Sequence, residues 1–334
     1  MRRATGATSR EFFRYRLWNS ATPLAERMSF MTWAQRRPLE AFLNPRTERF
    51  LVRSKLWSDG FYRDHGLPTP SRIGIWSPRA DPRSASDRLR TRDELIAVIA
   101  PLSAGVVFKL DVSGGGRSVL VFTSADRSGL RHPSGEHWSY DRLIDRMAIG
   151  EPWLVQARVT AHPVLAALAQ CDYTVTLRLV TCRRTNDRIL LLPATLKLPS
   201  IATGVDNFGR GNVAIAVSEE GVMGQGALGV DGPPIDKHPV TGVRFHGQRV
   251  PDWDDAVALV TRGQLLIGEL RSIGWDIAMT PQGPMILEGN VWWGADVLQQ
   301  PGLRGVLRGE FIDFLDEIGA GHLVNQQRRM DAAR

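Results

Sequence analysis

The stretch ILEGNVWWG, residues 286–294, places the carboxylate of Glu288 and the amide of Asn290 among residues typical of a buried strand. Side chains alternate between the two faces of a strand, so Glu288 and Asn290 are expected on one face, together with Ile286. Two oxygen-bearing side chains would then point the same way. The stretch therefore predicts a strand whose one polar face has a function.

A β-hairpin is predicted directly upstream of this strand. The segment GWDIAMT, residues 274–280, is joined to it by the turn residues Pro-Gln-Gly-Pro at 281–284. A register centred on Gln282 would place Asp276 opposite Glu288. Adjacent buried carboxylates repel each other and are costly to desolvate, so this arrangement requires a cation. Hard oxygen ligands from few side chains suit Mg²⁺; a surface hairpin with solvated acids is the alternative.

The basic residues of the chain are unusual in kind. The 334 residues carry a net charge of +7, which by itself would suit a nucleic-acid partner. Only four of the 42 basic residues are lysines, however, namely Lys55, Lys109, Lys197 and Lys237. A lysine kept in such an arginine-rich chain is a candidate for holding a phosphate as a point charge, with chance as the alternative. We therefore expect no nucleic-acid partner.

The chain divides into a helical N-terminal part and a longer part rich in strands. Apolar residues recur every three or four positions between about 10 and 50, which predicts a helical cap on the main body; a helix on a membrane surface is the alternative. Further helices are predicted at 94–100, 141–147 and 253–270. Short β-rich runs begin at Val106, and turn residues between them favour antiparallel pairing. These patterns predict a mixed α and β fold.

The sequence has no predicted membrane segment and few cysteines. A run of about 18 apolar residues is missing, so no membrane span is expected. The basic N-terminus lacks the apolar segment of a secretory signal, which favours a cytoplasmic location. Cys171 and Cys182 lack metal-ligand spacing, and we expect ordinary reduced thiols.

A glycine run follows the predicted strand that contains Lys109. Ser113, Gly114, Gly115 and Gly116 lie in VVFKLDVSGGGRSVLVF, between two β-rich runs. Glycines let the backbone approach a ligand closely, and exposed N–H groups can then bind phosphate oxygens. The P-loop and the dinucleotide fingerprint do not fit, because both require a helix after the glycines. A plain hairpin loop is the alternative.

Together these motifs resemble the ATP-grasp enzymes, most closely the sugar-transfer associated ATP-grasp proteins, which are related to the α-L-glutamate ligase-like group. The resemblance extends from about Lys55 to Gln300. Its motifs, in chain order, are Lys55 followed by Gly66-Leu67-Pro68, Lys109 with the glycine run, WLVQARVTAHP, TLRLVT with Arg178, VDNFGRGN, and Asp276 with Glu288 and Asn290. Two positions depart from the family pattern, since residues 157–164 contain no acid to hold the ribose and Arg117 stands where lysine is usual.

The resemblance implies an α+β fold in which two subdomains hold ATP between antiparallel sheets. The implied units are an N-terminal helical cap at 1–52, a first ATP-grasp subdomain with a glycine-rich lid at 53–152, a second subdomain with the metal site at 153–325, and a flexible tail at 326–334.

The resemblance also implies a role for each candidate residue. ATP would be bound by Lys55, Lys109, the run from Ser113 to Gly116, and backbone groups of Val155, Gln156 and Ala157 at the adenine edge. Mg²⁺ would be held by Asp276, Glu288 and Asn290. Lys197 would reach the γ-phosphate, and Arg178 would stabilise an acyl phosphate.

The implied activity is that of an ATP-dependent, Mg²⁺-dependent ligase. It would join a small-molecule or peptide carboxylate to an amine through an acyl phosphate. Phosphoryl transfer depends mainly on positioning and charge neutralisation, for which lysines, an arginine and Mg²⁺ are suitable. Two alternatives stay open: a phosphotransferase on the same fold, and a non-catalytic nucleotide-binding module.

Overall fold

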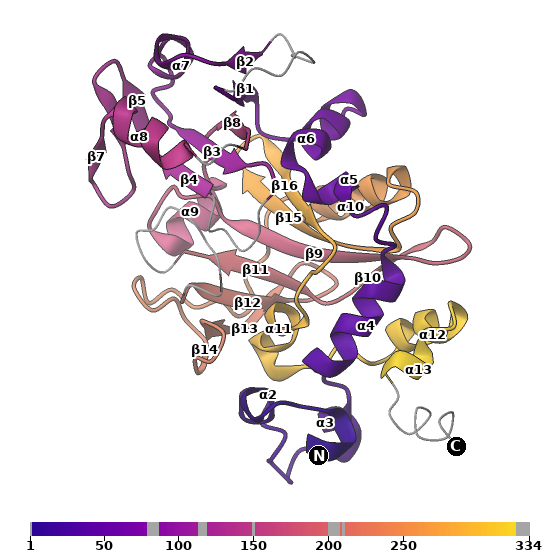
Figure 1. The fold of residues 1–334 in the computed structure, drawn as a ribbon. Coiled ribbons are helices and arrows are strands. Elements are labelled where there is room, and N and C mark those ends of the chain that lie inside the picture. Colours follow the sequence, from indigo (N-terminus) through magenta and orange to yellow (C-terminus); the bar gives the residue numbers. More distant parts are fainter. Residues whose placement is uncertain are drawn as a thin grey trace.

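Two β-sheets organise the chain, and each has its own hydrophobic core (Figure 1). The structure is a computed structural model that describes residues 2–78, 87–112, 119–148, 151–199, 208 and 211–324. The predictions for residues 113–116, for Arg117, for most of VDNFGRGN and for the tail at 326–334 therefore lie outside the described residues. The α+β fold predicted from the sequence is confirmed.

The smaller sheet contains five strands covered by two helices. The strands are β1 (Arg72–Trp76), β2 (Arg88–Leu89), β3 (Val106–Leu110), β4 (Val119–Phe122) and β8 (Trp153–Ala157), in the spatial order β2-β1-β8-β3-β4. Helices α7 (Arg92–Ile99) and α8 (Tyr140–Met147) pack on them through the buried side chains of Leu95, Ile99 and Leu143. A three-stranded sheet of β5 (Ser124–Asp126), β6 (Gly129–Arg131) and β7 (His137–Trp138) adjoins this unit.

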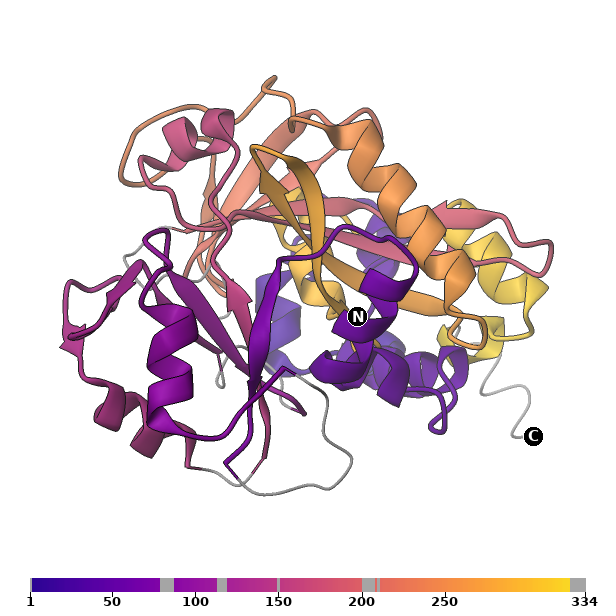
Figure 2. The ribbon, with the colours of Figure 1, turned by 90° about the horizontal axis from the view of Figure 1, so that it is seen from above.

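The larger sheet contains eight strands, and all of its pairs are antiparallel. The strands are β9 (Thr176–Arg183), β10 (Ile189–Leu191), β11 (Ala194–Leu198), β12 (Val213–Val217), β13 (Met223–Leu228), β14 (Pro234–Ile235), β15 (Ser272–Thr280) and β16 (Gly283–Asn290). Their order is β14-β13-β12-β11-β9-β15-β16, and β10 pairs with β9. Helices α9 (Pro163–Ala169) and α10 (Trp253–Leu266) pack on one face of this sheet. Figure 2 shows the two units side by side.

Strand β15 shows how the larger sheet separates its two faces. Trp275 and Ile277 are fully buried in the core that α10 covers. Gly274 and Asp276 alternate with them and therefore lie on the opposite face. The strand is buried along its whole length. A charged residue in it consequently needs partners within the protein.

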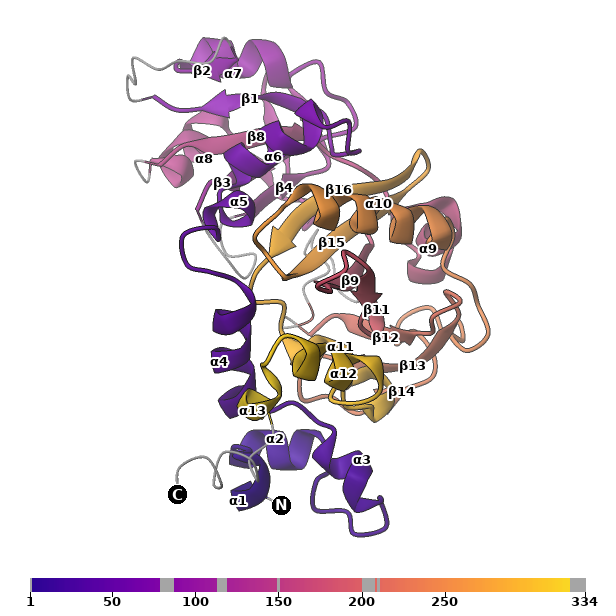
Figure 3. The same cartoon turned by 90° about the vertical axis from the view of Figure 1, so that its right-hand side faces the viewer.

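The N-terminal segment forms the predicted helical region. Its helices are α1 (Arg2–Thr5), α2 (Ser9–Arg14), α3 (Leu24–Met28), α4 (Trp33–Leu43), α5 (Phe50–Arg53) and α6 (Lys55–Asp64). Helix α4 packs against the second face of the larger sheet together with α11 (Ala295–Gln299), α12 (Glu310–Glu317) and α13 (Gly321–Val324). A short 3-10 helix, η2 (Pro301–Leu303), follows α11. The helical N-terminal region expected from the sequence is thus confirmed (Figure 3).

Helices α5 and α6 lie at the junction of the two sheets. Their Val52 and Tyr62 side chains belong to the core of the larger sheet. Gly289 of β16 allows this approach, because a Cβ at that position would lie 3.0 Å from Cγ1 of Val52. On the other side, Ser54 forms a β-bridge with Val112, just after β3. The start of α6 therefore contacts both units.

The two tryptophans of the opening stretch have different environments. Trp293 is fully buried between α4 and the sheet and lies across Gly274, where an added Cβ would be 2.3 Å from Cβ of Trp293. Trp292 is 41% exposed, and the Arg49 guanidinium lies 4.9 Å from the centre of its ring. Trp293 is thus a core residue, and it requires glycine at position 274.

Replacing Gly274 by alanine is expected to lower the free energy of unfolding by about 1–3 kcal/mol, because the added methyl group overpacks the core against Trp293. Urea unfolding followed by circular dichroism measures this change. Gly268→Ala is the matched control, since no atom lies within 4 Å of a Cβ at that position. Equal effects of the two substitutions would contradict the close packing of Trp293 on Gly274.

Candidate functional site

The hairpin of β15 and β16 has the predicted register at its functional end. Thr280 pairs with Gly283 across a two-residue loop, as in an ordinary tight hairpin. The register then shifts by one residue at Leu287, an extra residue that forms a β-bulge. Beyond the bulge, Asp276 pairs with Glu288. The predicted pairing is confirmed, but the bulge produces it rather than a turn centred on Gln282.

The same bulge interrupts the regular alternation of side chains that the sequence predicted along β16. Ile286 is fully buried in the core on the α10 side of the sheet, so it does not share a face with Glu288. Glu288 and Asn290 do share a face, and Nδ2 of Asn290 lies 3.3 Å from Oε1 of Glu288 as a donor. A bulge re-aims side chains in this way because one strand has two residues opposite one.

Asp276 is only 6% exposed and is held by two cations from neighbouring strands. Arg178 in β9 donates from Nε and Nη2 to the two carboxylate oxygens, each at 2.9 Å. Lys197 in β11 donates from Nζ to Oδ1, also at 2.9 Å. Burial alone would raise the pKa of Asp276, but the charges of Arg178 and Lys197 outweigh burial and hold this pKa well below the usual range. The structure therefore brings the predicted Arg178 and Lys197 to Asp276.

Lys109 and Lys55 approach the same hairpin from the side of the smaller sheet. Lys109 in β3 donates from Nζ to the backbone carbonyl of Leu287, at 3.4 Å. Burial lowers the pKa of Lys109 to about 8, while the nearby charge of Glu288 opposes the decrease. Lys55, the first residue of α6, donates from Nζ to the carbonyl of Asp111 at 3.2 Å. Burial also lowers the pKa of Lys55, and Glu288 again opposes it. Both lysines thus interact with the charge of Glu288.

A pocket of about 100 Å³ opens beside Lys109. Apolar side chains of β3, β4 and Leu287 form most of its wall, and Gln156 is among its few polar residues. Gln156 donates from Nε2 to Asp59 at 2.8 Å, whereas its buried Oε1 has no hydrogen-bond partner within the described part of the chain. Apolar walls with few polar groups are typical of a small-ligand site.

Two of the three residues predicted at the adenine edge, Gln156 and Ala157, line this pocket. Val155 precedes them in the middle of the smaller sheet, where it is paired with Gly74 on one side and with Phe108 on the other. Its side chain is fully buried in the core on the α7 and α8 side. The contact of all three residues with a nucleotide stays a prediction.

The oxygen donors of the hairpin fit a hard divalent cation in part. Asp276, Glu288 and Asn290 share one face, and Mg²⁺ needs few protein ligands. Both oxygens of Asp276, however, already accept hydrogen bonds from Arg178 or Lys197. No group of three or more His, Cys, Asp or Glu side chains suited to a metal occurs in the ranges that the structure describes. Glu288 and Asn290 are therefore the better candidates, because Oδ2 of Asp276 has one acceptor position left and Oδ1 already accepts two hydrogen bonds.

Two acidic residues that the sequence analysis did not single out hold the lysine-bearing elements. The carboxylate of Asp111 accepts hydrogen bonds from Ser54 Oγ at 2.9 Å and from the Leu56 backbone at 3.0 Å. Asp59 pairs with Arg72 at 3.3 Å and accepts from Gln156. The spacing of each aspartate from a lysine in the sequence could have identified both residues. Asp111 follows Lys109 by two residues along a strand, and Asp59 follows Lys55 by four along a helix, so each shares a face with its lysine.

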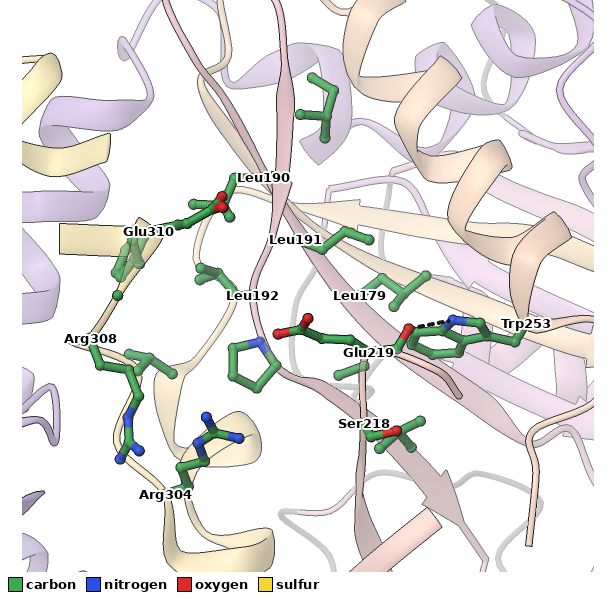
Figure 4. A pocket seen from close by; sticks show the side chains of 17 residues that line it. Leu179, Leu190, Leu191, Leu192, Ser218, Glu219, Trp253, Arg304, Arg308 and Glu310 are labelled. Carbon is green, nitrogen blue, oxygen red and sulfur yellow. Dashed lines mark hydrogen bonds between the residues drawn. The ribbon is translucent and has the colours of Figure 1, made fainter. Parts of the chain in front are cut away.

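Another pocket, of about 470 Å³, lies apart from these residues (Figure 4). Leucines of β10 line it, with Arg304, Arg308 and Glu310 from the C-terminal segment. The indole of Trp253 donates to the backbone carbonyl of Glu219 at 3.0 Å and forms part of the wall. None of the predicted site residues lines this pocket.

Two units meet at this site, and one contributes lysines while the other contributes a hairpin with carboxylates. This arrangement is that of an ATP-grasp protein. More narrowly, the chain belongs to the sugar-transfer associated ATP-grasp family, whose sequence profile matches residues 34–310. ATP-grasp proteins are usually ATP-dependent ligases.

Solved structures of similar fold are distant in sequence. A D-alanine–D-alanine ligase from Coxiella burnetii is 10% identical, with a TM-score of 0.46, over 90% of this chain and 69% of that chain. An N5-carboxyaminoimidazole ribonucleotide synthetase bound to ADP is 11% identical, with a TM-score of 0.42, over 72% of this chain. A phosphoribosylamine–glycine ligase from Thermotoga maritima is 15% identical, with a TM-score of 0.41, over 74% of this chain. This chain spans 45% of the synthetase and 49% of the glycine ligase.

One further comparison limits what can be transferred from known proteins. No curated protein matches the sequence. Within the described residues, no helix is long and apolar enough to cross a membrane, as expected from the sequence.

Replacing Lys109 by methionine is expected to weaken ATP binding about tenfold or more, because a charge-assisted contact to phosphate is lost. Isothermal titration calorimetry with Mg²⁺ and ATP measures the affinity. Lys237→Met is the matched control, since Lys237 is an exposed lysine of the same chain. Loss of affinity in both variants, or in neither, would contradict a specific phosphate contact by Lys109.

Proposed function

We propose that this protein is an ATP-dependent, Mg²⁺-dependent ligase that joins a carboxylate to an amine. One observation carries the proposal: Lys109, reaching from the smaller sheet, meets the buried hairpin whose Asp276 is paired with Arg178 and Lys197. Cations outnumber carboxylates at this junction, which suits a polyphosphate and the anions that form during phosphoryl transfer.

The pocket beside Lys109 is the proposed adenine site. Its apolar walls suit a flat aromatic base, and the unpartnered Oε1 of Gln156 could accept a hydrogen bond from an exocyclic amino group. Lys109 and Lys55 would then contact the phosphates. Both lysines have a pKa that burial lowers, and a bound polyphosphate favours their charged forms.

Glu288 and Asn290 are the proposed ligands of Mg²⁺, with Asp276 as a third candidate. When bound, the ion neutralises charge on phosphate oxygens. The protein residues have separate tasks. Lys197 would contact the γ-phosphate, and Arg178 would hold the reacting carboxylate. The guanidinium of Arg178 is oriented by Asp276 and by the carbonyl of Trp293, which accepts from Nη1 at 3.0 Å.

The proposed reaction has two steps. A carboxylate oxygen of the substrate attacks the γ-phosphorus, the bond to the β-phosphate oxygen breaks, and ADP leaves, so that an acyl phosphate forms. The amine then attacks the acyl carbon, phosphate leaves with the bonding electron pair, and loss of a proton gives the amide. No protein nucleophile is needed in either step.

An ADP-release screen across carboxylates and amines with Mg²⁺, followed by mass measurement of products, tests the proposal. We expect ADP, phosphate and an amide when both substrates are present. Glu288→Gln is expected to reduce turnover about 100-fold or more. Glu269→Gln, which changes an exposed glutamate, is expected to have no effect.

Two outcomes would contradict these assignments. Unchanged turnover in Glu288→Gln would remove Glu288 from the metal site. A stable phosphorylated product that forms without an amine and is not consumed by one would establish the phosphotransferase alternative instead.

A further inference from the structure

An arginine-lined groove separates the N-terminal helices from the larger sheet. It consists of two adjoining pockets of about 620 and about 400 Å³, between α2, the loop after β13 and the start of α11. Figures 1 and 3 both show α2 beside these elements. We define the arginine groove by the residues Arg10, Arg14, Arg16, Trp33 and Arg36.

Two aspartates pair with Arg10, Arg14 and Arg36 of the arginine groove, and the buried Glu40 also lies 3.6 Å from Nε of Arg36. Asp231 binds both Arg10 and Arg14, the latter at 2.9 Å from Nη2 to Oδ1. Asp296 lies 3.3 Å from Nη1 of Arg36 and 3.8 Å from Nη1 of Arg14. Both aspartates are partly exposed, at 43% and 31% of their side-chain areas. Their contacts are therefore open to competition by an anion from solution.

A third carboxylate in the arginine groove has a structural task. Oε1 of Glu11 accepts from the backbone N–H of Trp33 at 2.6 Å, and Oε2 accepts from the backbone N–H of Thr8 at 2.9 Å. Glu11 therefore fixes α2 against α4 rather than neutralising the arginines. Arg14 and Arg36 are largely buried, with 10% and 16% of their side chains exposed, so an anion there would be shielded from water.

The arginine groove opens on the face of the larger sheet that carries Lys197. Lys197 pairs with Ala214, and Ala214 pairs with Ala227, so these three residues share one face. Ala227 lines the arginine groove. Helix α11 lies over this face, since Oγ1 of Thr195 in β11 donates to the carbonyl of Val297 at 2.9 Å. Ala214 and Ala227 are themselves buried in a cluster with Phe208, so the cations around Asp276 and the arginine groove lie on the same face of the sheet with packed side chains between them.

We propose that the arginine groove is a second anion site, separate from the nucleotide site, which binds a phosphate or diphosphate group. Paired guanidinium groups match the oxygens of such a group, and Trp33, half exposed and stacked under Arg36 at 4.4 Å, offers an apolar wall. This inference rests on the groove itself and goes beyond the proposed ligase function.

Inorganic pyrophosphate is a suitable probe, titrated by calorimetry into the full-length protein with the nucleotide site filled by MgADP. Arg14→Gln and Arg36→Gln are each expected to weaken binding about tenfold. Arg37→Gln is the matched control, because Arg37 lies on the same helix and does not line the groove, and its guanidinium is 5.7 Å from the Trp33 ring without contacting Asp231 or Asp296 in any ion pair among the described residues. Asp231→Asn is expected to strengthen binding, since it frees Arg10 and Arg14. Thermal unfolding verifies that each variant is folded.

A further arm separates this inference from the proposed function. Pyrophosphate that binds at the cations near Asp276 would lose affinity in Lys109→Met and keep it in Arg14→Gln, which would overturn the inference. Equal losses in Arg37→Gln and Arg14→Gln would also overturn it, because diffuse surface charge would then explain binding. Pyrophosphate binding that depends on Arg14 and Arg36, in a protein that releases no ADP with any substrate, would retain the anion site and reject the ligase function.

Discussion

The ion pairs of Asp276 are the interaction on which the functional end of the larger sheet depends. A buried carboxylate is tolerated there because Arg178 approaches from β9, the strand beside β15, and Lys197 approaches from β11, the strand beyond β9. Removing the carboxylate of Asp276 would leave the charges of Arg178 and Lys197 in the core without this compensating charge, at a cost of several kcal/mol. Arg178 also binds the carbonyl of Trp293, so the same guanidinium fixes the chain after β16. One cluster thus orders three strands and the segment that leads to α11.

The β-bulge at Leu287 connects this cluster to the smaller sheet. It turns Glu288 toward Asp276, and it leaves Leu287 at the pocket beside Lys109. The carbonyl of Leu287 accepts from Nζ of Lys109, which makes the bulge the contact point of the two units. Local deviations from regular pairing are common where strands carry functional side chains. Here the bulge places the carboxylate of Glu288 near Lys55 and Lys109, so that its charge acts on both lysines.

Much of this arrangement was predictable from local patterns, and the rest required long-range information. Turn residues and polar spacing predicted the hairpin and the pairing of Asp276 with Glu288, and the scarcity of lysines singled out Lys55, Lys109 and Lys197. The bulge was missed because alternation along β16 is regular in the sequence. The ion pair of Arg178 with Asp276 depends on which strands are neighbours in the sheet, and so does the position of Ala227 in the arginine groove. Local sequence patterns do not contain the order of the strands.

The central claim is that nucleotide and metal meet at the hairpin of β15 and β16. A crystal structure with ADP and Mn²⁺, in which anomalous scattering locates the metal, tests it most directly. The account predicts the base in the pocket lined by Gln156, phosphates beside Lys109, and the metal bound to Glu288 and Asn290. A metal bound elsewhere, or phosphates bound without contact to Lys109, would contradict the account.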